Sequence, residues 1–178
     1  MTVKNLIIKL YHAILNPYSF VVRKIRGIVI LSYVKSHKGE IFVGGKTRLS
    51  RNTILNKNPS FNGMDVNGGG RVVFGNNFHS GHECLILPSI HNYDKGTMIP
   101  YDDTYIDKEI IIGDNVWFGS RVTVVGGVTI GEGAIIQAGA VVVNSIPECA
   151  IAGGNPAKVF KYRDKEHYYN LKEKGKFH

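Results

Sequence analysis

The 178-residue sequence has two cysteines, one tryptophan and no long hydrophobic run. Cys84 and Cys149 are too few and too far apart for a disulfide framework or a four-ligand zinc site. We therefore expect two buried thiols in a protein of a reducing compartment, the cytoplasm. The longest strongly apolar run, Gly27 to Val34, has eight residues, whereas a membrane-spanning helix needs about 20. No spanning helix is expected.

Acidic residues are scarce in the first third of the chain. Residues 1–60 contain eleven Lys or Arg against the single acid Glu40, and the whole chain carries a formal net charge of +8. Such a basic region can contact nucleic acid, an anionic membrane surface or an anionic polymer. No helix-turn-helix pattern, zinc-finger spacing or RNA-binding signature accompanies it, so we do not expect nucleic-acid binding.

A six-residue period dominates the second half of the chain. Apolar residues recur at every sixth position, and small or branched residues follow four positions later. The first set is Ile112, Phe118, Val124, Ile130, Ile136 and Val142, and the second is Val116, Val122, Val128, Ala134, Ala140 and Ile146. An α-helix with 3.6 residues per turn cannot keep every sixth residue on one face. Short strands joined by tight corners, three per coil, satisfy this period.

The period continues upstream, with one irregularity. It is visible at Phe74, Ser80 and Ile86, and more weakly at Val43, Leu49 and Leu55. Leu55 and Phe74 are 19 residues apart, one more than three hexapeptides. The three glycines at 68–70 are the expected place for the extra residue, because glycine tolerates unusual turns.

A polar stretch interrupts the repeat between Ile86 and Ile112, which are 26 residues apart. It predicts an extruded loop over residues 92–109, and long loops that leave a regular scaffold are often functional. His91 comes directly before this loop and directly after Ile90, which the period predicts to be packed. The loop offers sugar-like hydrogen-bonding and stacking partners in Asp102, Asp103, Tyr93, Tyr101 and Tyr105.

The repeat and two further motifs resemble the hexapeptide-repeat acyltransferases, in the branch of sugar, maltoside, galactoside and capsular polysaccharide O-acetyltransferases. One motif is the histidine before an extended loop, followed by Gly113-Asp114-Asn115-Val116-Trp117-Phe118-Gly119. The other is the closing segment Gly154-Asn155-Pro156-Ala157-Lys158-Val159. The resemblance covers residues 70–163. It implies an all-β, left-handed parallel β-helix, a homotrimer, and acetyl-coenzyme A as co-substrate.

The same resemblance assigns roles to individual residues. His91 would be the general base, and Trp117 a wall beside the histidine and the acyl arm. Asp94 matches an acid of some relatives that can orient the His91 ring, and a backbone carbonyl is the alternative for this role. Ser120 would donate its backbone N–H to the oxyanion. Lys158 and Arg163 are candidates for contacts with the coenzyme phosphates, and a solvated charged face is the alternative interpretation of both. The full set assigned to coenzyme binding is Trp117, Gly119, Ser120, Ala138, Gly139, Asn155, Pro156, Ala157 and Lys158. Imidazole suits the base role because it titrates near neutral pH.

Other histidines have plainer interpretations. His79, His82 and Glu83 fall at outward positions of the repeat, and no further ligand cluster is evident, so no metal is expected.

Three regions follow from these patterns. Residues 1–38 form a basic helical segment, with Leu6, Leu10, Ala13 and Ile14 at helical spacing and an end at Asn16-Pro17. Residues 39–160 form the β-helix, and residues 161–178 form a tail with a short helix. We favour residues 1–38 as a cap on the open first coil. The alternative is docking on an anionic membrane, which would place the protein at the membrane's inner face.

The predicted function is acetyl transfer to a saccharide hydroxyl, in the synthesis of a surface or capsular polysaccharide. Two alternatives remain open. One is an N-acetyltransferase of an amino-sugar nucleotide or a xenobiotic, and the other is a non-catalytic β-helix binding protein.

Overall fold

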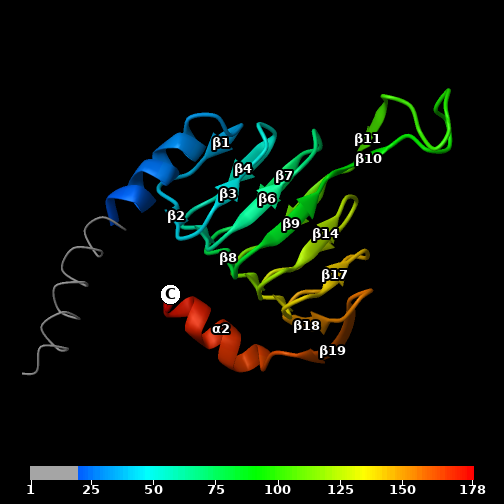
Figure 1. Ribbon diagram of the computed structural model, residues 1–178. Coiled ribbons are helices and arrows are strands. Elements are labelled where there is room, and N and C mark those ends of the chain that lie inside the picture. Colours follow the sequence, from blue (N-terminus) through cyan, green and yellow to red (C-terminus); the bar gives the residue numbers. More distant parts are fainter. Residues whose placement is uncertain (1–19) are drawn as a thin grey trace, which may run out of the picture.

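Short parallel strands stack into the three walls of a prism (Figure 1). The computed structural model describes residues 20–178, so the helix predicted to end at Asn16-Pro17 lies outside it. Wall A contains β1 (Ser36–His37), β4 (Thr53–Leu55), β7 (Val72–Phe74), β12 (Ile110–Ile112) and β15 (Thr129–Ile130). Wall C contains β3 (Thr47–Arg48), β6 (Met64–Val66), β9 (Cys84–Leu87), β14 (Thr123–Val125) and β17 (Val141–Val142).

Wall B is the longest of the three. It contains β2 (Phe42–Val43), β5 (Ser60–Phe61), β8 (His79–Ser80), β13 (Trp117–Phe118), β16 (Ile135–Ile136), β18 (Ala150–Gly153) and β19 (Lys158–Tyr162). β19 runs antiparallel to β18 and covers the last edge of this wall. The chain visits the walls in the order A, B, C, and we name the corners between them A–B, B–C and C–A.

The six-residue period produces this arrangement because it returns an apolar side chain to the interior once per wall. Phe118 pairs with Ile136 one coil later, and both are fully buried. Strands of neighbouring coils lie about 4.8 Å apart, so the buried side chains form continuous columns. The predicted all-β solenoid is confirmed, and both cysteines are buried free thiols as expected.

The irregularity between Leu55 and Phe74 has two parts. Phe61 and Val66, which fill equivalent positions of walls B and C, are five residues apart, one fewer than the repeat. Val66 and Phe74 are eight apart, two more than the repeat. The surplus lies at the glycines of residues 68–70, as predicted. A Cβ at Gly70 would lie 2.3 Å from the Pro88 carbonyl oxygen, so a larger residue does not fit.

Asparagines form a ladder along the A–B corner. Asn58 donates to Asn77 (3.2 Å), Asn77 donates to Asn115 (2.9 Å), and all three have a positive φ of 53 to 57°. Asparagine tolerates this left-handed conformation better than most residues. Asn115 then donates to the hydroxyl of Tyr168 (2.9 Å), which donates to Glu132 (2.9 Å).

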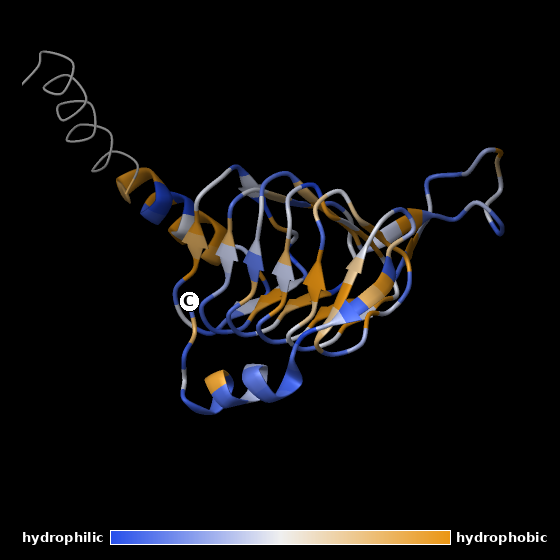
Figure 2. Cartoon of the chain, turned by 90° about the horizontal axis from the view of Figure 1, so that it is seen from below, coloured by the Kyte–Doolittle hydropathy of each residue, from blue (hydrophilic) through white to orange (hydrophobic). Residues whose placement is uncertain are grey.

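Tyr168 belongs to α2 (Lys165–Glu173), the helix predicted in the tail. Asp164 caps it by accepting the backbone N–H of His167 at 2.9 Å. Tyr168 is the residue of α2 that is buried, and the remainder of the helix is mainly hydrophilic (Figure 2). The ladder and this tyrosine therefore hold α2 against the side of the prism.

Residues 20–31 are helical and close the end of the prism next to β1 (Figure 1). Ile30 and Val34 are buried in the core, and Gly27 is buried beside Ile41. This position agrees with the capping interpretation. Residues 20–31 fall within the helical segment predicted over residues 1–38, but the helical spacing that supported this prediction ends at Asn16-Pro17. Within residues 20–178, every helix is too short or too polar to cross a membrane.

The interruption of the repeat is an antiparallel hairpin that projects from the C–A corner (Figure 1). Its strands are β10 (Ser89–His91) and β11 (Tyr105–Asp107). Ile90 was expected to be packed, but 46% of its surface is exposed. That expectation was wrong because the chain has already left the coil after β9, so Ile90 pairs with Ile106 across the hairpin instead of entering the core.

We expect Phe78→Ala to lower the free energy of unfolding by about 3 to 5 kcal/mol. Phe78 is fully buried, and its ring centroid lies 4.8 to 5.5 Å from those of Phe61, Phe74 and Phe118. Urea denaturation measures the change. Phe160→Ala is the control, because Phe160 is 57% exposed and should change stability by less than about 0.5 kcal/mol.

Candidate functional site

His91 is held between two tyrosines at the base of the hairpin. Its ring centroid lies 3.8 Å from that of Tyr101 at an interplanar angle of 20°, and 4.3 Å from that of Tyr105 at 36°. Tyr105 is the direct cross-strand partner of His91. The two rings fix the plane of the imidazole.

One nitrogen of this imidazole has no partner in the described chain. His91 Nδ1 is buried and makes no hydrogen bond within residues 20–178. Asp94, predicted to orient the ring, is exposed. Its orienting role stays a prediction.

The base of the hairpin is anchored in the prism. Ser89 Oγ donates to Asp107 Oδ1 (2.5 Å) and accepts the backbone N–H groups of Gly69 (2.8 Å) and Gly70 (3.2 Å). The glycines that absorb the irregular spacing therefore also fix the hairpin strands, and His91 lies two residues beyond this anchor.

The tip of the hairpin is organised by a carboxylate. Asp102 accepts hydrogen bonds from the hydroxyl of Thr104 (2.5 Å) and the backbone N–H groups of Thr97 (2.7 Å) and Thr104 (2.9 Å). These bonds hold the pKa of the carboxyl well below its usual range. Both carboxylate oxygens are thus engaged inside the loop, and of the two acids considered as sugar ligands only Asp103 is left exposed.

Apart from Trp117, the residues assigned to coenzyme binding gather along the B–C corner. A Cβ at Gly119 would lie 2.5 Å from the backbone nitrogen of Ala138, and Gly139 N donates to Ser120 O at 2.9 Å. On the next coil, the Val141 N–H donates to the Gly154 carbonyl oxygen (2.9 Å), and the Ala157 N–H donates to the Val141 carbonyl oxygen (2.8 Å). The segment Asn155-Pro156 and Lys158 are exposed beside them, while Ala157 is packed into the core.

Ser120 has a free donor at this corner. Its backbone N–H makes no hydrogen bond within residues 20–178, whereas its side-chain oxygen accepts the N–H of His82 at 3.2 Å. A backbone N–H on a rigid corner is the kind of donor that stabilises an oxyanion. The geometry is therefore compatible with the role assigned to Ser120.

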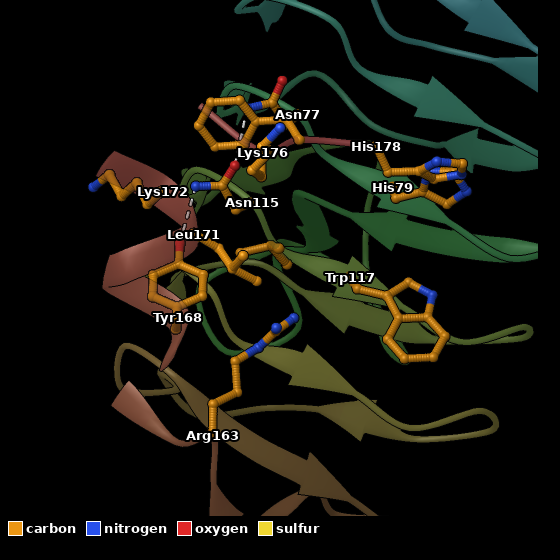
Figure 3. Close-up of a pocket in the computed structure, with 12 residues that line it drawn as sticks. Asn77, His79, Asn115, Trp117, Arg163, Tyr168, Leu171, Lys172, Lys176 and His178 are labelled. Carbon is orange, nitrogen blue, oxygen red and sulfur yellow. Dashed lines mark hydrogen bonds between the residues drawn. The ribbon is translucent and has the colours of Figure 1, made fainter. Parts of the chain in front are cut away.

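Trp117 lies on the outer face of wall B and is 49% exposed. It lines a cavity of about 450 Å³ between this wall, α2 and the last residues of the chain (Figure 3). Arg163 also lines this cavity, whereas Lys158 does not. The two residues assigned together to the coenzyme phosphates are thus separated. This cavity is a feature that the sequence interpretation missed, because no motif links α2 to wall B.

The structure distributes the assigned residues over different faces. His91 lies on the hairpin of the C–A corner, and the glycine-rich row lies at the B–C corner. Trp117 lies on wall B, between the A–B and B–C corners. Within residues 20–178 the His, Cys, Asp and Glu side chains form no group of three able to hold a metal ion.

Residues 109–144 match the bacterial transferase hexapeptide family, described as six repeats. The matched segment runs from β12 to β17, where the six-residue period is most regular. Over these residues the chain carries the hexapeptide repeat of this family. The chain also resembles curated acetyltransferases. A putative acetyltransferase of Saccharomyces cerevisiae is 34% identical over 111 residues, which cover 52% of this chain and 57% of the relative.

A probable acetyltransferase of Mycobacterium tuberculosis is 32% identical to this chain over 130 residues, covering 73% of this chain and 40% of the relative. The chain thus spans about half the length of these curated relatives. A solved maltose O-acetyltransferase from Clostridium difficile has a TM-score of 0.60 at 25% identity, covering 78% of this chain and 75% of the other.

A galactoside acetyltransferase in complex with coenzyme A has a TM-score of 0.57 at 21% identity, covering 80% of this chain and 72% of the other, and shares the fold. These likenesses agree with the left-handed parallel β-helix implied by the resemblance.

Proposed function

We propose that this protein is an acetyltransferase that moves an acetyl group from acetyl-coenzyme A to a hydroxyl of a saccharide, with His91 as general base. The observation that carries the proposal is the imidazole fixed between Tyr101 and Tyr105 on a hairpin anchored in a rigid prism. A surface or capsular polysaccharide is the class of product that we expect, and the cytoplasm is the expected compartment.

The B–C corner supports the coenzyme assignment. Gly139 has open space around it, with a φ of +74°, and the neighbouring Ser120 N–H is free within the described chain. An extended arm can therefore lie along the corner, with Lys158 placed near its phosphates. Acetyl-coenzyme A supplies the activated acyl group as a thioester.

The proposed reaction needs no covalent enzyme intermediate. His91 removes the proton of the acceptor hydroxyl while its oxygen attacks the thioester carbonyl carbon. The carbonyl oxygen becomes an oxyanion, which the Ser120 N–H stabilises. When the C–S bond breaks, the protonated His91 returns its proton to the departing thiolate. The products are an acetyl ester and the free thiol, and the base is regenerated.

Exposed aromatic rings support a saccharide acceptor. Tyr93, Tyr101 and Tyr105 are 47 to 61% exposed on the hairpin that carries His91. The apolar C–H faces of sugar rings pack on aromatic rings, and phenolic hydroxyls can bond sugar hydroxyls. An amine acceptor on an amino sugar would use the same base, so N-acetylation is the alternative that differs least in geometry.

The separation of His91 from the B–C corner supports a homotrimer. One chain presents the two parts at different corners of its prism, so the hairpin of one subunit would meet the corner row of its neighbour. A closed ring of three prisms allows every subunit to make both contacts.

We expect His91→Ala to lower kcat by about 10² to 10⁴-fold, the usual contribution of a general base. Thiol release from acetyl-coenzyme A, measured with a panel of sugars and amino sugars, gives the rates. His167→Ala is the matched control, since His167 is exposed on α2 and should leave turnover unchanged. Equal turnover in the wild type and in His91→Ala would contradict the role of His91. Turnover with amino sugars alone would select the N-acetyltransferase alternative.

Mixing two inactive variants tests whether the site is shared between subunits. His91→Ala and Trp117→Ala change parts that one chain does not bring together, so co-expressed mixed trimers should contain some intact sites and regain up to about one third of the activity. Light scattering of the purified protein verifies the trimer. Activity that stays absent in verified mixed trimers would contradict a site built from two subunits.

We also propose a peripheral contact between an anionic membrane and the helix at residues 20–31. Its outer face carries Phe20, Val21, Ile25, Ile28 and Val29, each 52 to 66% exposed. Arg23, Lys24 and Arg26 flank this face. An apolar stripe with basic flanks suits an interfacial helix, and positive charge complements anionic lipid. Capping the prism uses the opposite face, so both roles are compatible.

We expect the wild-type protein to float with vesicles containing phosphatidylglycerol and not with neutral phosphatidylcholine vesicles. Ile25→Asp combined with Ile28→Asp should reduce the floated fraction severalfold, because both changes place charge in the apolar stripe. Ile99→Asp is the control, since Ile99 is 96% exposed at the hairpin tip. Failure of the wild type to float with anionic vesicles would contradict the contact.

A further inference from the structure

A small cavity lies where the helix at residues 20–31 meets β2, the edge strand of wall B (Figure 1). Its volume is about 220 Å³, below the roughly 300 Å³ at which ordinary small-molecule sites begin, so it suits a small chemical group. The helix, the A–B corner and β2 supply its lining, which consists of Phe20, Arg23, Lys24, Glu40, Ile41, Phe42, Val43 and Asn58.

Arg23 is the cation of this lining that no carboxylate neutralises. Its guanidinium carbon lies 5.3 Å from the centre of the Phe42 ring, and within residues 20–178 its side chain has no hydrogen-bond or ion-pair partner. Stacking on an aromatic ring holds a guanidinium in place and leaves its N–H groups available. Arg23 therefore presents a planar set of donors at a defined position.

The other polar groups of the lining are engaged with one another or with the ladder. Lys24 Nζ donates to Glu40 Oε2 at 2.7 Å. This hydrogen bond, and then the charge of Lys24, lowers the pKa of Glu40, so the carboxylate stays ionised and paired. Asn58 donates to Asn77 at 3.2 Å. The charge left over is that of Arg23, and the cavity therefore favours an anion.

The place of the cavity indicates which anion it suits. Phe20 lines the cavity and also belongs to the apolar stripe proposed to enter the membrane surface, where it is 61% exposed. A ligand seated here has its charged group beside Arg23 and its next atoms beside Phe20. A guanidinium binds a phosphate through two parallel hydrogen bonds, and a terminal phosphate is the smallest headgroup that a phospholipid carries.

We propose that this cavity binds the terminal phosphate of a membrane lipid, with Arg23 contacting the phosphate and Phe20 packing against the acyl portion. This site rests on the peripheral membrane contact proposed above and adds headgroup selectivity to it. A contact made by the apolar stripe and its basic flanks responds to the surface charge of the membrane. A cavity that admits the phosphate distinguishes lipids that give the same surface charge.

Flotation with two kinds of vesicle tests the selectivity. Phosphatidylcholine vesicles receive either phosphatidic acid, whose phosphate is terminal, or phosphatidylglycerol, whose phosphate carries a glycerol, and the zeta potentials are matched. We expect the wild-type protein to bind the phosphatidic acid vesicles severalfold more tightly. Arg23→Gln should remove this preference, because it removes the donors in the cavity.

Arg26→Gln is the matched control, since it removes the same charge from the same helix. Arg26 is exposed, donates to the Gly44 carbonyl oxygen at 3.4 Å and does not line the cavity. It should weaken binding to both kinds of vesicle alike and keep the preference. Circular dichroism verifies that both variants are folded.

Dihexanoyl phosphatidic acid below its critical micelle concentration tests the cavity without a membrane. We expect calorimetry to show binding that Arg23→Gln weakens by about tenfold or more, the usual loss for a hydrogen bond to a charged group, and that Arg26→Gln leaves unchanged. Glycerol 3-phosphate, which has the same terminal phosphate and no acyl chains, should bind more weakly than the short-chain lipid. Equal affinity for the two would assign the cavity to a soluble phosphate ester and overturn the assignment to a lipid.

The outcomes separate this site from the peripheral contact. Equal binding of the wild type to both kinds of vesicle, or equal loss of the preference in Arg23→Gln and Arg26→Gln, would overturn the site and leave the peripheral contact intact. Failure to float with either vesicle would contradict the peripheral contact. Absence of calorimetric binding to dihexanoyl phosphatidic acid would overturn the site whatever the vesicles show.

Discussion

Backbone hydrogen bonding between successive coils is the constraint on which the rest of this structure depends. Each coil must place its strands about 4.8 Å above the previous ones, and each corner must turn the chain without a side chain in the way. Gly119 illustrates the constraint, since a Cβ there would press on the backbone of Ala138. The same closeness produces a flat outer corner, where an extended ligand can approach the backbone. A structural requirement of the fold thus prepares a binding surface.

The same rigidity explains how a surface histidine can be placed for catalysis. His91 is outside the prism, yet it lies two residues from Ser89, which is bonded to backbone groups of Gly69 and Gly70. Its plane is set by two tyrosine rings, and the far end of the hairpin is held by Asp102. Such preorganisation keeps the base in position before the substrates arrive.

Much of the fold could be predicted from the sequence because the six-residue period follows directly from which side chains pack in the interior. Each hexapeptide places one side chain in the interior, so the buried columns through Phe118 and Ile136 can be predicted directly from the apolar residues at every sixth position. The glycines at 68–70 could be predicted because the spacing from Leu55 to Phe74 exceeds three hexapeptides by one residue and glycine tolerates unusual turns. The bounds of the helix at residues 20–31 could not be predicted within the segment 1–38, since its apolar residues lie on both the capping face and the outer face.

The site was predictable only where a motif carries it. His91 and Trp117 stand in recognisable segments, but their distances from other groups depend on which corner each segment reaches. The period could not show that the chain leaves the prism before Ile90. It also could not show that the Asp102 carboxylate accepts hydrogen bonds within its own loop. The cavity between α2 and wall B arises from contacts between residues about 50 apart, such as Asn115 and Tyr168, and local patterns do not encode such contacts.

The asparagine ladder limits how the length of this protein can change during evolution. Because Asn58, Asn77 and Asn115 bond to one another across neighbouring coils, gaining or losing one residue at the A–B corner would move an amide out of phase with those above and below. Removal or duplication of a complete coil would preserve the phase. Extra residues are tolerated at the C–A corner, where the hairpin emerges. New specificity can therefore arise by exchanging that hairpin while the ladder keeps the scaffold in alignment.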